Sequence, residues 1–172
     1  VDSVQQLSSE LAVANDELLP TRHGDFSLHT YEDNIYGGTH LALTMGDIKP
    51  QDSTIVRVHQ ADVLRDLVGA VPSAPKWTID SCLERIAKEG QGVLVLLGQT
   101  EDRNLQGSID AFFDTAVPRQ FNTDGSGAYL NVGTGSQILR DLGVGKMRLL
   151  SQEMKFNAIS GFDLEIEEYI DC

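Results

Sequence analysis

The sequence from Thr78 to Leu97 reads TIDSCLERIAKEGQGVLVLL, a helix signal followed directly by a strand signal. Thr78 can cap the start of a helix, and Gly90 follows its end. The apolar residues between them recur at helical spacing: Ile79, Cys82, Leu83 and Ile86. Val93–Leu97 is an unbroken aliphatic run, typical of a buried strand. The stretch therefore predicts a helix over residues 77–89 that leads straight into the core of a sheet.

Outward from this stretch, further short apolar runs predict strands, with Gly or Pro at most of the joints. The predicted strands are Phe26–Tyr31, His40–Met45, Thr54–His59, Val93–Leu97, Lys146–Ser151 and Phe162–Tyr169. Two more helices are expected over Asn104–Ala116 and Ser136–Leu142, with a long loop over residues 116–131. Strand follows strand in the first half, which favours antiparallel pairing, whereas strand and helix alternate in the second half. The sequence thus predicts a single α+β domain with a mixed sheet and flanking helices.

The composition is that of an acidic globular protein. Its 172 residues include 13 basic and 26 acidic ones, a formal net charge of −13, and 41% are hydrophobic. A field of that sign repels polyanions, so no nucleic-acid partner is expected. The longest aliphatic run is far too short for a bilayer span, so no membrane association is expected either. The two cysteines, Cys82 and Cys172, support neither a disulfide framework nor a cysteine-rich metal site, and a cytoplasmic protein is expected.

Several short motifs follow one another in order along the chain. They are Leu19-Pro20-Thr21-Arg22-His23-Gly24-Asp25-Phe26, His40-Leu41-Ala42-Leu43, Gly46-Asp47-Ile48, Val56-Arg57-Val58-His59, Gly90-Gln91-Gly92-Val93-Leu94, Glu101 to Asn104, Gln137-Ile138-Leu139-Arg140-Asp141-Leu142-Gly143-Val144 and Arg148-Leu149-Leu150. As an ordered set these motifs resemble GTP cyclohydrolase II, the zinc enzyme that opens the imidazole ring of GTP at the start of riboflavin synthesis. The resemblance covers residues 19–169 and implies the mixed sheet of that family.

The residues before the resemblance form a polar, acidic segment. The chain begins at Val1 and not at Met, and we expect residues 1–18 to be a linker ahead of a domain over residues 19–172. In fused proteins of this pathway, such a segment follows an N-terminal 3,4-dihydroxy-2-butanone 4-phosphate synthase domain. The resemblance therefore implies a longer protein with a fused synthase domain as partner, and a homodimer is expected.

The positions that hold zinc in the family are altered in this chain. The resemblance implies three cysteine ligands, and the corresponding residues here are Asp62, Ser73 and Pro75. A catalytic zinc site needs three protein ligands and an open position, and a proline cannot be a side-chain ligand. We therefore expect that zinc is lost and that the chain holds no cofactor. Without the metal, no water is activated near neutral pH to attack the guanine ring.

The positions of the family's general base and nucleophile are altered as well. The resemblance implies an acidic residue and an arginine two positions apart, and here those positions are Ala128 and Leu130. Neither side chain can transfer a proton or attack phosphorus. The segment between Arg103 and Asn131 is also shorter than is usual in the family. These losses together indicate a pseudoenzyme domain.

A vestige of the family's nucleotide site remains. The residues that match it are Arg57, His59, Glu101, Arg103, Ser151 and Lys155. The family has a glycine between the acidic residue and the arginine, where the backbone approaches phosphate closely, and this chain has Asp102. The added negative charge weakens the case for phosphate binding.

Four features allow both a functional and a structural interpretation. His59 and Asp62 could be metal ligands, but we favour a hydrogen-bonded structural histidine. The Gly133–Ser136 segment could bind an anion at the start of a helix, but we favour a tight turn. Trp77 could fill the space that the metal left or simply pack in the core. A solvated strand face, in place of acid–base chemistry, is the favoured interpretation of Glu165, Glu167 and Glu168.

Three functions follow from this pattern. The favoured hypothesis is a catalytically inactive GTP cyclohydrolase II-like domain that serves riboflavin biosynthesis as a structural or regulatory partner of the fused synthase. The alternative is a sensor that still binds GTP or a pathway product, through Arg57, Arg103 and Lys155, without turnover. An active GTP cyclohydrolase II is the least favoured, because it needs a metal held without cysteine and a substitute for the arginine missing at Leu130.

Overall fold

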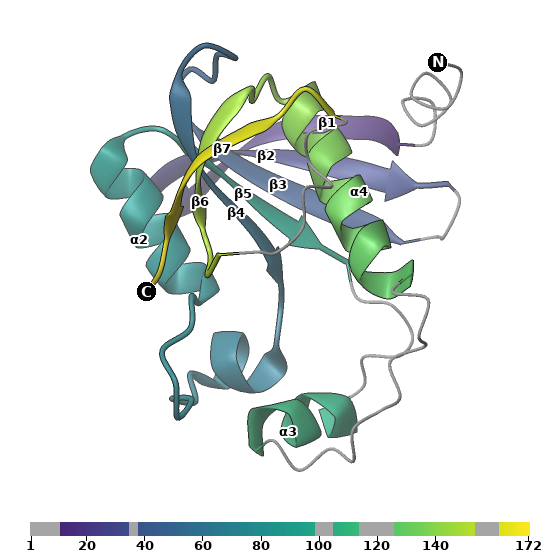
Figure 1. Cartoon of the computed structure of the whole chain (residues 1–172), viewed down its shortest axis with the longest axis vertical. Coiled ribbons are helices and arrows are strands. Elements are labelled where there is room, and N and C mark those ends of the chain that lie inside the picture. Colours follow the sequence, from purple (N-terminus) through teal and green to yellow (C-terminus); the bar gives the residue numbers. More distant parts are fainter. Residues whose placement is uncertain (1–10, 35–37, 99–104, 114–125, 154–161) are drawn as a thin grey trace.

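The computed structural model describes residues 11–34, 38–98, 105–113, 126–153 and 162–172, which are arranged around one mixed sheet (Figure 1). Its strands are β1 (Leu11–Thr21), β2 (Gly24–Asp33), β3 (Thr39–Met45), β4 (Ser53–Gln60), β5 (Gly92–Leu97), β6 (Lys146–Leu150) and β7 (Glu165–Ile170). They lie in the order β1-β2-β3-β5-β4-β6-β7. The α+β class with a mixed sheet, predicted from the sequence, is confirmed.

The first three strands form an antiparallel meander. The antiparallel pairing expected for the first half of the sequence is confirmed for β2 and β3. It is wrong for β4, because β5 lies between β3 and β4 and pairs in parallel with β4. The turn between β1 and β2 is closed by the Thr21 hydroxyl, which donates to the Gly24 carbonyl at 2.8 Å. Gly24 has φ +123°, a conformation that other residues rarely adopt. The meander begins earlier than the sequence analysis expected, because residues 11–18, assigned there to a linker, belong to β1 and pair with β2.

The second half of the sheet is parallel. β5 lies between β3, to which it is antiparallel, and β4, to which it is parallel. β6 then pairs with β4 and β7 pairs with β6, both in parallel. Parallel neighbours need a crossover segment, and α2 belongs to the crossover between β4 and β5.

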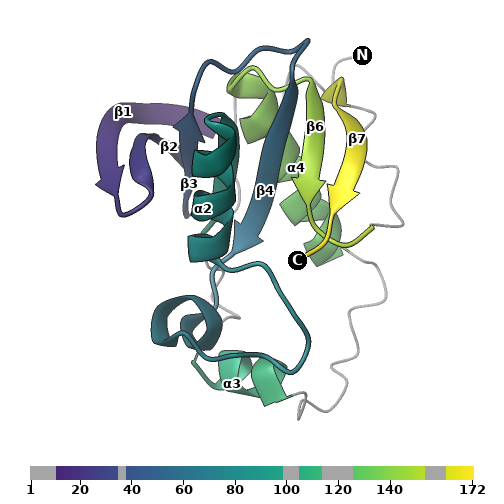
Figure 2. The same ribbon diagram turned by 90° about the vertical axis from the view of Figure 1, so that its left-hand side faces the viewer.

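Helices cover both faces of the sheet (Figures 1 and 2). Helix α2 (Ile79–Glu89) begins at a capping box formed by Thr78 and Ser81 and ends at Gly90, which is left-handed with φ +76°. The cap at Thr78 and the end before Gly90 are as predicted, and the helix begins two residues later than the predicted range of 77–89. Helix α4 (Ser126–Asp141) packs on the opposite face.

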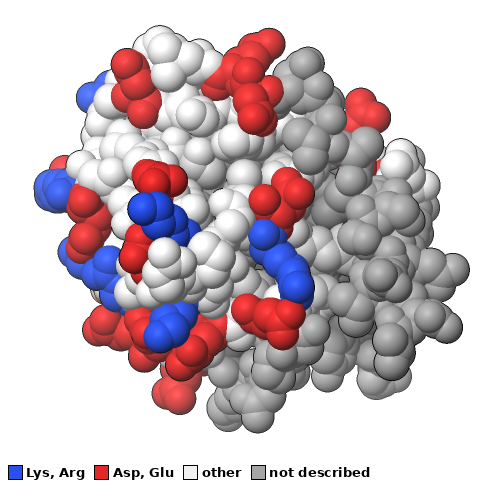
Figure 3. Space-filling model, turned by 90° about the horizontal axis from the view of Figure 1, so that it is seen from above, with Lys and Arg blue, Asp and Glu red and all other residues white. Residues whose placement is uncertain are grey.

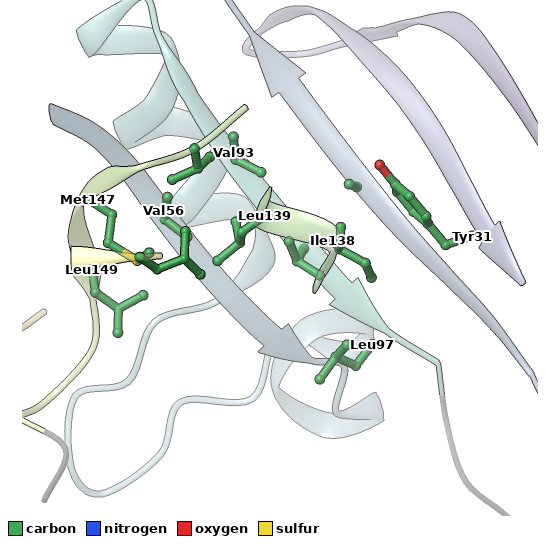
Figure 4. Close-up of a cluster of buried hydrophobic side chains, with 12 residues drawn as sticks. Tyr31, Val56, Val93, Leu97, Ile138, Leu139, Met147 and Leu149 are labelled. Carbon is green, nitrogen blue, oxygen red and sulfur yellow. The ribbon is translucent and has the colours of Figure 1, made fainter. Parts of the chain in front are cut away.

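Each face has its own apolar cluster because side chains alternate along a strand. Leu94 and Ile55 point towards α2 and meet Ile86. Val93 and Val56 point the other way and pack with the α4 residues in the second cluster (Figure 4). That cluster contains Tyr31, Ala42, Val56, Val93, Val95, Leu97, Ile138, Leu139, Val144, Met147, Leu149 and Leu164. β4 and β5 therefore contribute side chains to the clusters on both faces, as the unbroken apolar run of β5 indicated.

Two helices differ from the sequence expectation. α4 starts at Ser126 and not at Ser136, so part of the expected loop over residues 116–131 is helical. A single π-helical turn, η1 (Val63–Val68), follows β4 and was not predicted. Helix α3 (Leu105–Phe113) lies within the predicted range, and β7 starts at Glu165, later than predicted. Among the described residues, no helix is both long and apolar enough to cross a bilayer.

Candidate functional site

The candidate site lies where β4 ends, next to η1 and the start of α2. β4, β5 and β6 are parallel, so their C-terminal ends meet at one edge of the sheet, where α/β folds commonly place their sites. β4 brings Arg57 and His59 to this edge, and η1 places Arg65 and Asp66 beside them. His59 is fully buried, and the Asp66 side chain is 4% exposed.

The Asp66 carboxylate is the centre of a buried network. Its Oδ2 atom accepts hydrogen bonds from His59 Nε2 at 2.9 Å, from Arg65 Nη2 at 3.1 Å and from the backbone N–H of Asp62 at 2.8 Å. Its Oδ1 atom accepts from the Ile79 backbone N–H at 3.0 Å. One carboxylate therefore ties together the end of β4, the π-turn η1 and the first residue of α2.

These hydrogen bonds set the charge of Asp66. Burial alone would raise the pKa of the carboxyl, but the bonds from His59, Asp62, Arg65 and Ile79 outweigh burial and hold the pKa well below its usual range. Asp66 is therefore ionised at neutral pH, and its negative charge is matched by the neighbouring guanidinium of Arg65.

His59 is held as a neutral imidazole. Burial lowers its pKa, and the charges of Arg57 and Arg65 lower it further, against the opposing effect of Asp66. The Arg57 Nε donates to His59 Nδ1 at 3.1 Å, so the ring proton lies on Nε2 and is donated to Asp66. With both ring nitrogens engaged, His59 is a structural residue, in agreement with the favoured interpretation of the sequence.

The structure describes the three residues that the resemblance matches to the family's zinc ligands. Asp62 caps η1, its Oδ1 accepting from the Arg65 backbone N–H at 3.0 Å. Ser73 and Pro75 lie exposed in the segment before α2, and proline offers no side-chain donor atom. Within the described part of the chain, no group of three His, Cys, Asp or Glu side chains is placed to hold a metal ion. Cys82 points into the α2 cluster, and burial raises the pKa of its thiol to about 12.

The residues matched to the nucleotide site are only partly described. The Arg57 Nη1 donates to the Leu150 carbonyl at 2.8 Å, so the guanidinium is engaged at two of its nitrogens inside the protein. The Ser151 hydroxyl donates to the Gln152 carbonyl at 2.9 Å. Glu101, Arg103 and Lys155 lie outside the described residues. Ala128 and Leu130, which the resemblance matches to the family's base and nucleophile, lie in the first two turns of α4.

The anion-binding interpretation of residues 133–136 is wrong, and so is the tight turn that we favoured over it. These residues lie inside α4, so their backbone N–H groups are not the free donors of a helix start. Gly135 is instead a packing residue, because an added Cβ would lie 3.1 Å from Val58 Cγ1. The glycine lets α4 approach β4 closely.

Two further residues singled out in the sequence have structural partners. The Trp77 indole donates to the Ile170 carbonyl at 3.0 Å and packs against the α2 cluster, which supports the core-packing interpretation. Glu165 and Glu168 are exposed on β7, and Glu167 lies 3.9 Å from the Lys146 ammonium across the sheet. The solvated strand face fits these positions.

Sequence reasoning missed Arg65 and also the residue at the centre of the network, Asp66. Its only signal is a carboxylate seven positions after His59, beyond the end of the strand. A pairing at that spacing depends on η1, and a single π-turn has no periodic pattern from which it could be predicted.

The chain belongs to the GTP cyclohydrolase II family, whose model matches residues 12–171. The resemblance drawn from the sequence motifs is thereby confirmed.

The relatives of this chain are longer proteins. It is 48% identical over 154 residues to a 3,4-dihydroxy-2-butanone 4-phosphate synthase of Pseudomonas syringae pv. tomato, covering 88% of this chain and 41% of that protein. It is 35% identical over 164 residues to the riboflavin biosynthesis protein RibBA of Aquifex aeolicus, covering 88% and 39%.

A solved structure resembles the chain as well. It is RibBX, a two-domain 3,4-dihydroxy-2-butanone 4-phosphate synthase from A. baumannii, with a TM-score of 0.67 and 32% identity over 96% of this chain and 42% of that one. The chain thus spans about two fifths of the length of these relatives.

Proposed function

We propose that this chain is a catalytically inactive GTP cyclohydrolase II-like domain of riboflavin biosynthesis, acting in the cytoplasm as a structural or regulatory partner of a fused 3,4-dihydroxy-2-butanone 4-phosphate synthase. The proposal rests on the residues that stand where the family has its three cysteine ligands to zinc. Asp62 is used as a helix cap, and Ser73 and Pro75 are exposed and lack thiolates. These three residues cannot supply the three protein ligands that a catalytic zinc ion needs.

The link to the synthase rests on the relatives. A chain of the Pseudomonas syringae synthase contains a stretch 48% identical to this domain, and this domain accounts for only 41% of it. A domain that keeps its fold and core but not its catalytic side chains still offers a stable surface, which a neighbouring domain can use.

The sensor alternative is less well supported. Arg57, one of its three basic residues, is partly buried and donates to a backbone carbonyl and to His59. Two of its five N–H donors are therefore already used inside the protein, which leaves fewer of them for a nucleotide phosphate.

Two experiments test the proposal. In the first, synthase kinetics and melting temperature of the full-length protein are compared with those of a version that lacks residues 11–172. We expect lower synthase turnover or a lower melting temperature without the domain, and unchanged kinetics and melting would contradict the partner role.

In the second experiment, GTP is titrated calorimetrically into the chain with magnesium and zinc present. We expect no heat beyond dilution. A steady heat signal would show continuing turnover and overturn the inactive assignment, whereas a saturable signal without steady heat would favour the sensor.

A further inference from the structure

An apolar patch lies at the end of the molecule formed by η1 and α3. The two elements lie side by side in both ribbon views (Figures 1 and 2), although they are far apart in the sequence. Leu67 is 81% exposed, Val71 88% and Phe113 64%. The members of the patch, which we call the η1–α3 patch, are Leu67, Val68, Val71, Leu105, Ile109 and Phe113.

The two segments that carry the patch are poor in charge. Residues 67–75 and 105–113 contain a single charged residue, Asp110, in a chain of which 23% is charged. The opposite end of the molecule carries many acidic and several basic side chains (Figure 3). Contiguous exposed apolar side chains on an otherwise charged protein mark a contact surface.

The η1 part of the patch is held in shape from the inside. Asp66 anchors η1 to β4 and α2 through its buried hydrogen bonds, and the next two residues, Leu67 and Val68, are directed to solvent. A surface that is rigid before it binds loses less entropy on binding.

The charge of the chain argues against a second copy as the occupant. Each copy carries −13, so two copies that met at this patch would repel each other during the approach. A different polypeptide with an apolar face does not necessarily carry the same charge, so this repulsion is not inherent in its binding. The relatives contain such a polypeptide, because about three fifths of the length of each lies outside the part that this chain matches.

We propose that the η1–α3 patch is the docking surface for the synthase domain. This inference rests on the proposed function, because it takes the synthase to be the partner, and it adds which face makes the contact. Docking would cover Leu67, Val71 and Phe113, and it would stabilise η1 and α3 more than other parts of the domain.

Hydrogen exchange in the full-length protein and in the isolated chain tests the location. Amides of residues 63–75 and 105–113 should exchange about tenfold or more slowly in the full-length protein, whereas those of residues 16–21 should be unchanged. Slowing confined to another face would overturn the patch and leave the partner role standing. Slowing nowhere would overturn the docking proposal, and the synthase comparison described above would then decide the proposed function independently.

Matched leucine variants test the mechanism. Leu67→Asp in the full-length protein should abolish the slowing and bring synthase turnover and melting to the values of the version without this domain. Leu18→Asp is the control, because Leu18 is also an exposed leucine, 70% exposed, but lies on β1. Equal effects of the two variants, or no effect of Leu67→Asp, would overturn the proposal. Protection of the patch in the isolated chain that grows with its concentration would identify a second copy as the occupant and would overturn it too.

Discussion

Replacing Asp66 should destabilise the domain far more than replacing an exposed carboxylate. In Asp66→Asn, the amide oxygen can take the Oδ2 position and keep the bonds from His59, Arg65 and the Asp62 N–H. The amide nitrogen then faces the Ile79 N–H, so two donors meet where a carboxylate oxygen accepted at 3.0 Å. One lost buried hydrogen bond to a charged group costs about 1–3 kcal/mol.

Asp66→Ala removes all four bonds and leaves the Arg65 charge without its partner. Removing one member of a buried ion pair typically costs about 3–5 kcal/mol. For a domain of this size, 1 kcal/mol corresponds to about 2–4 °C in melting temperature, so the alanine variant should melt roughly 6–20 °C lower. The order of stability is therefore wild type, asparagine variant, alanine variant.

The assay is urea unfolding followed by circular dichroism, with thermal melts alongside. Asp163→Asn is the matched control, because Asp163 is also paired with an arginine, Arg140 at 2.7 Å, but its side chain is 81% exposed. An exposed pair of this kind contributes at most about 1 kcal/mol. If Asp66→Ala and Asp163→Asn changed the free energy of unfolding equally, the network would not be the support inferred from its geometry.

Three further predictions follow from the packing and from the altered catalytic positions. Burial lowers the pKa of His59, so as pH falls below about 6.5 the unfolded chain takes up a proton that the native chain does not. The free energy of unfolding should therefore decrease towards acid pH. His59→Gln should reduce this pH dependence, as measured by urea titrations at pH 7.5 and 5.5. Gly133→Ala, at an open position inside α4, should stabilise the domain by up to about 1 kcal/mol. Gly135→Val should destabilise it by about 1–3 kcal/mol, because the valine side chain collides with Val58. Equal effects of the two variants in thermal melts would contradict the close packing of α4 on β4. Leu130→Arg should release no formate from GTP in an enzymatic formate assay, and measurable release would contradict the inactive assignment.

Elements with local signals were predictable from the sequence, and elements decided by tertiary contacts were not. Helix α2 has its cap, its period and its terminal glycine within one stretch, and the structure places all three as predicted. β1 carries exposed polar residues such as Asp16 and Glu17, as an edge strand can, and so its pattern resembles a linker. α4 contains Gly133 and Gly135, which read as a turn, yet packing on Val58 outweighs their low helix propensity.

The candidate site was predictable only in part for the same reason. Motif order placed Arg57 and His59 on a strand that ends at the site, and it also identified Asp62 as a residue unsuited to replace a thiolate. The role of Asp66 depends on a turn that brings it beneath His59, and only the three-dimensional arrangement reveals that turn.

The strand order also has a consequence for synthesis of the protein. β4 is completed at Gln60, but one of its two neighbours, β6, is made only when Lys146–Leu150 emerges. Until then a nascent chain presents the unpaired edge of an apolar strand, which can pair with other chains. Messenger RNAs truncated before the codon for Lys146 should therefore yield aggregated protein. The C-terminal strands thus protect the growing polypeptide from aggregation as well as completing its sheet.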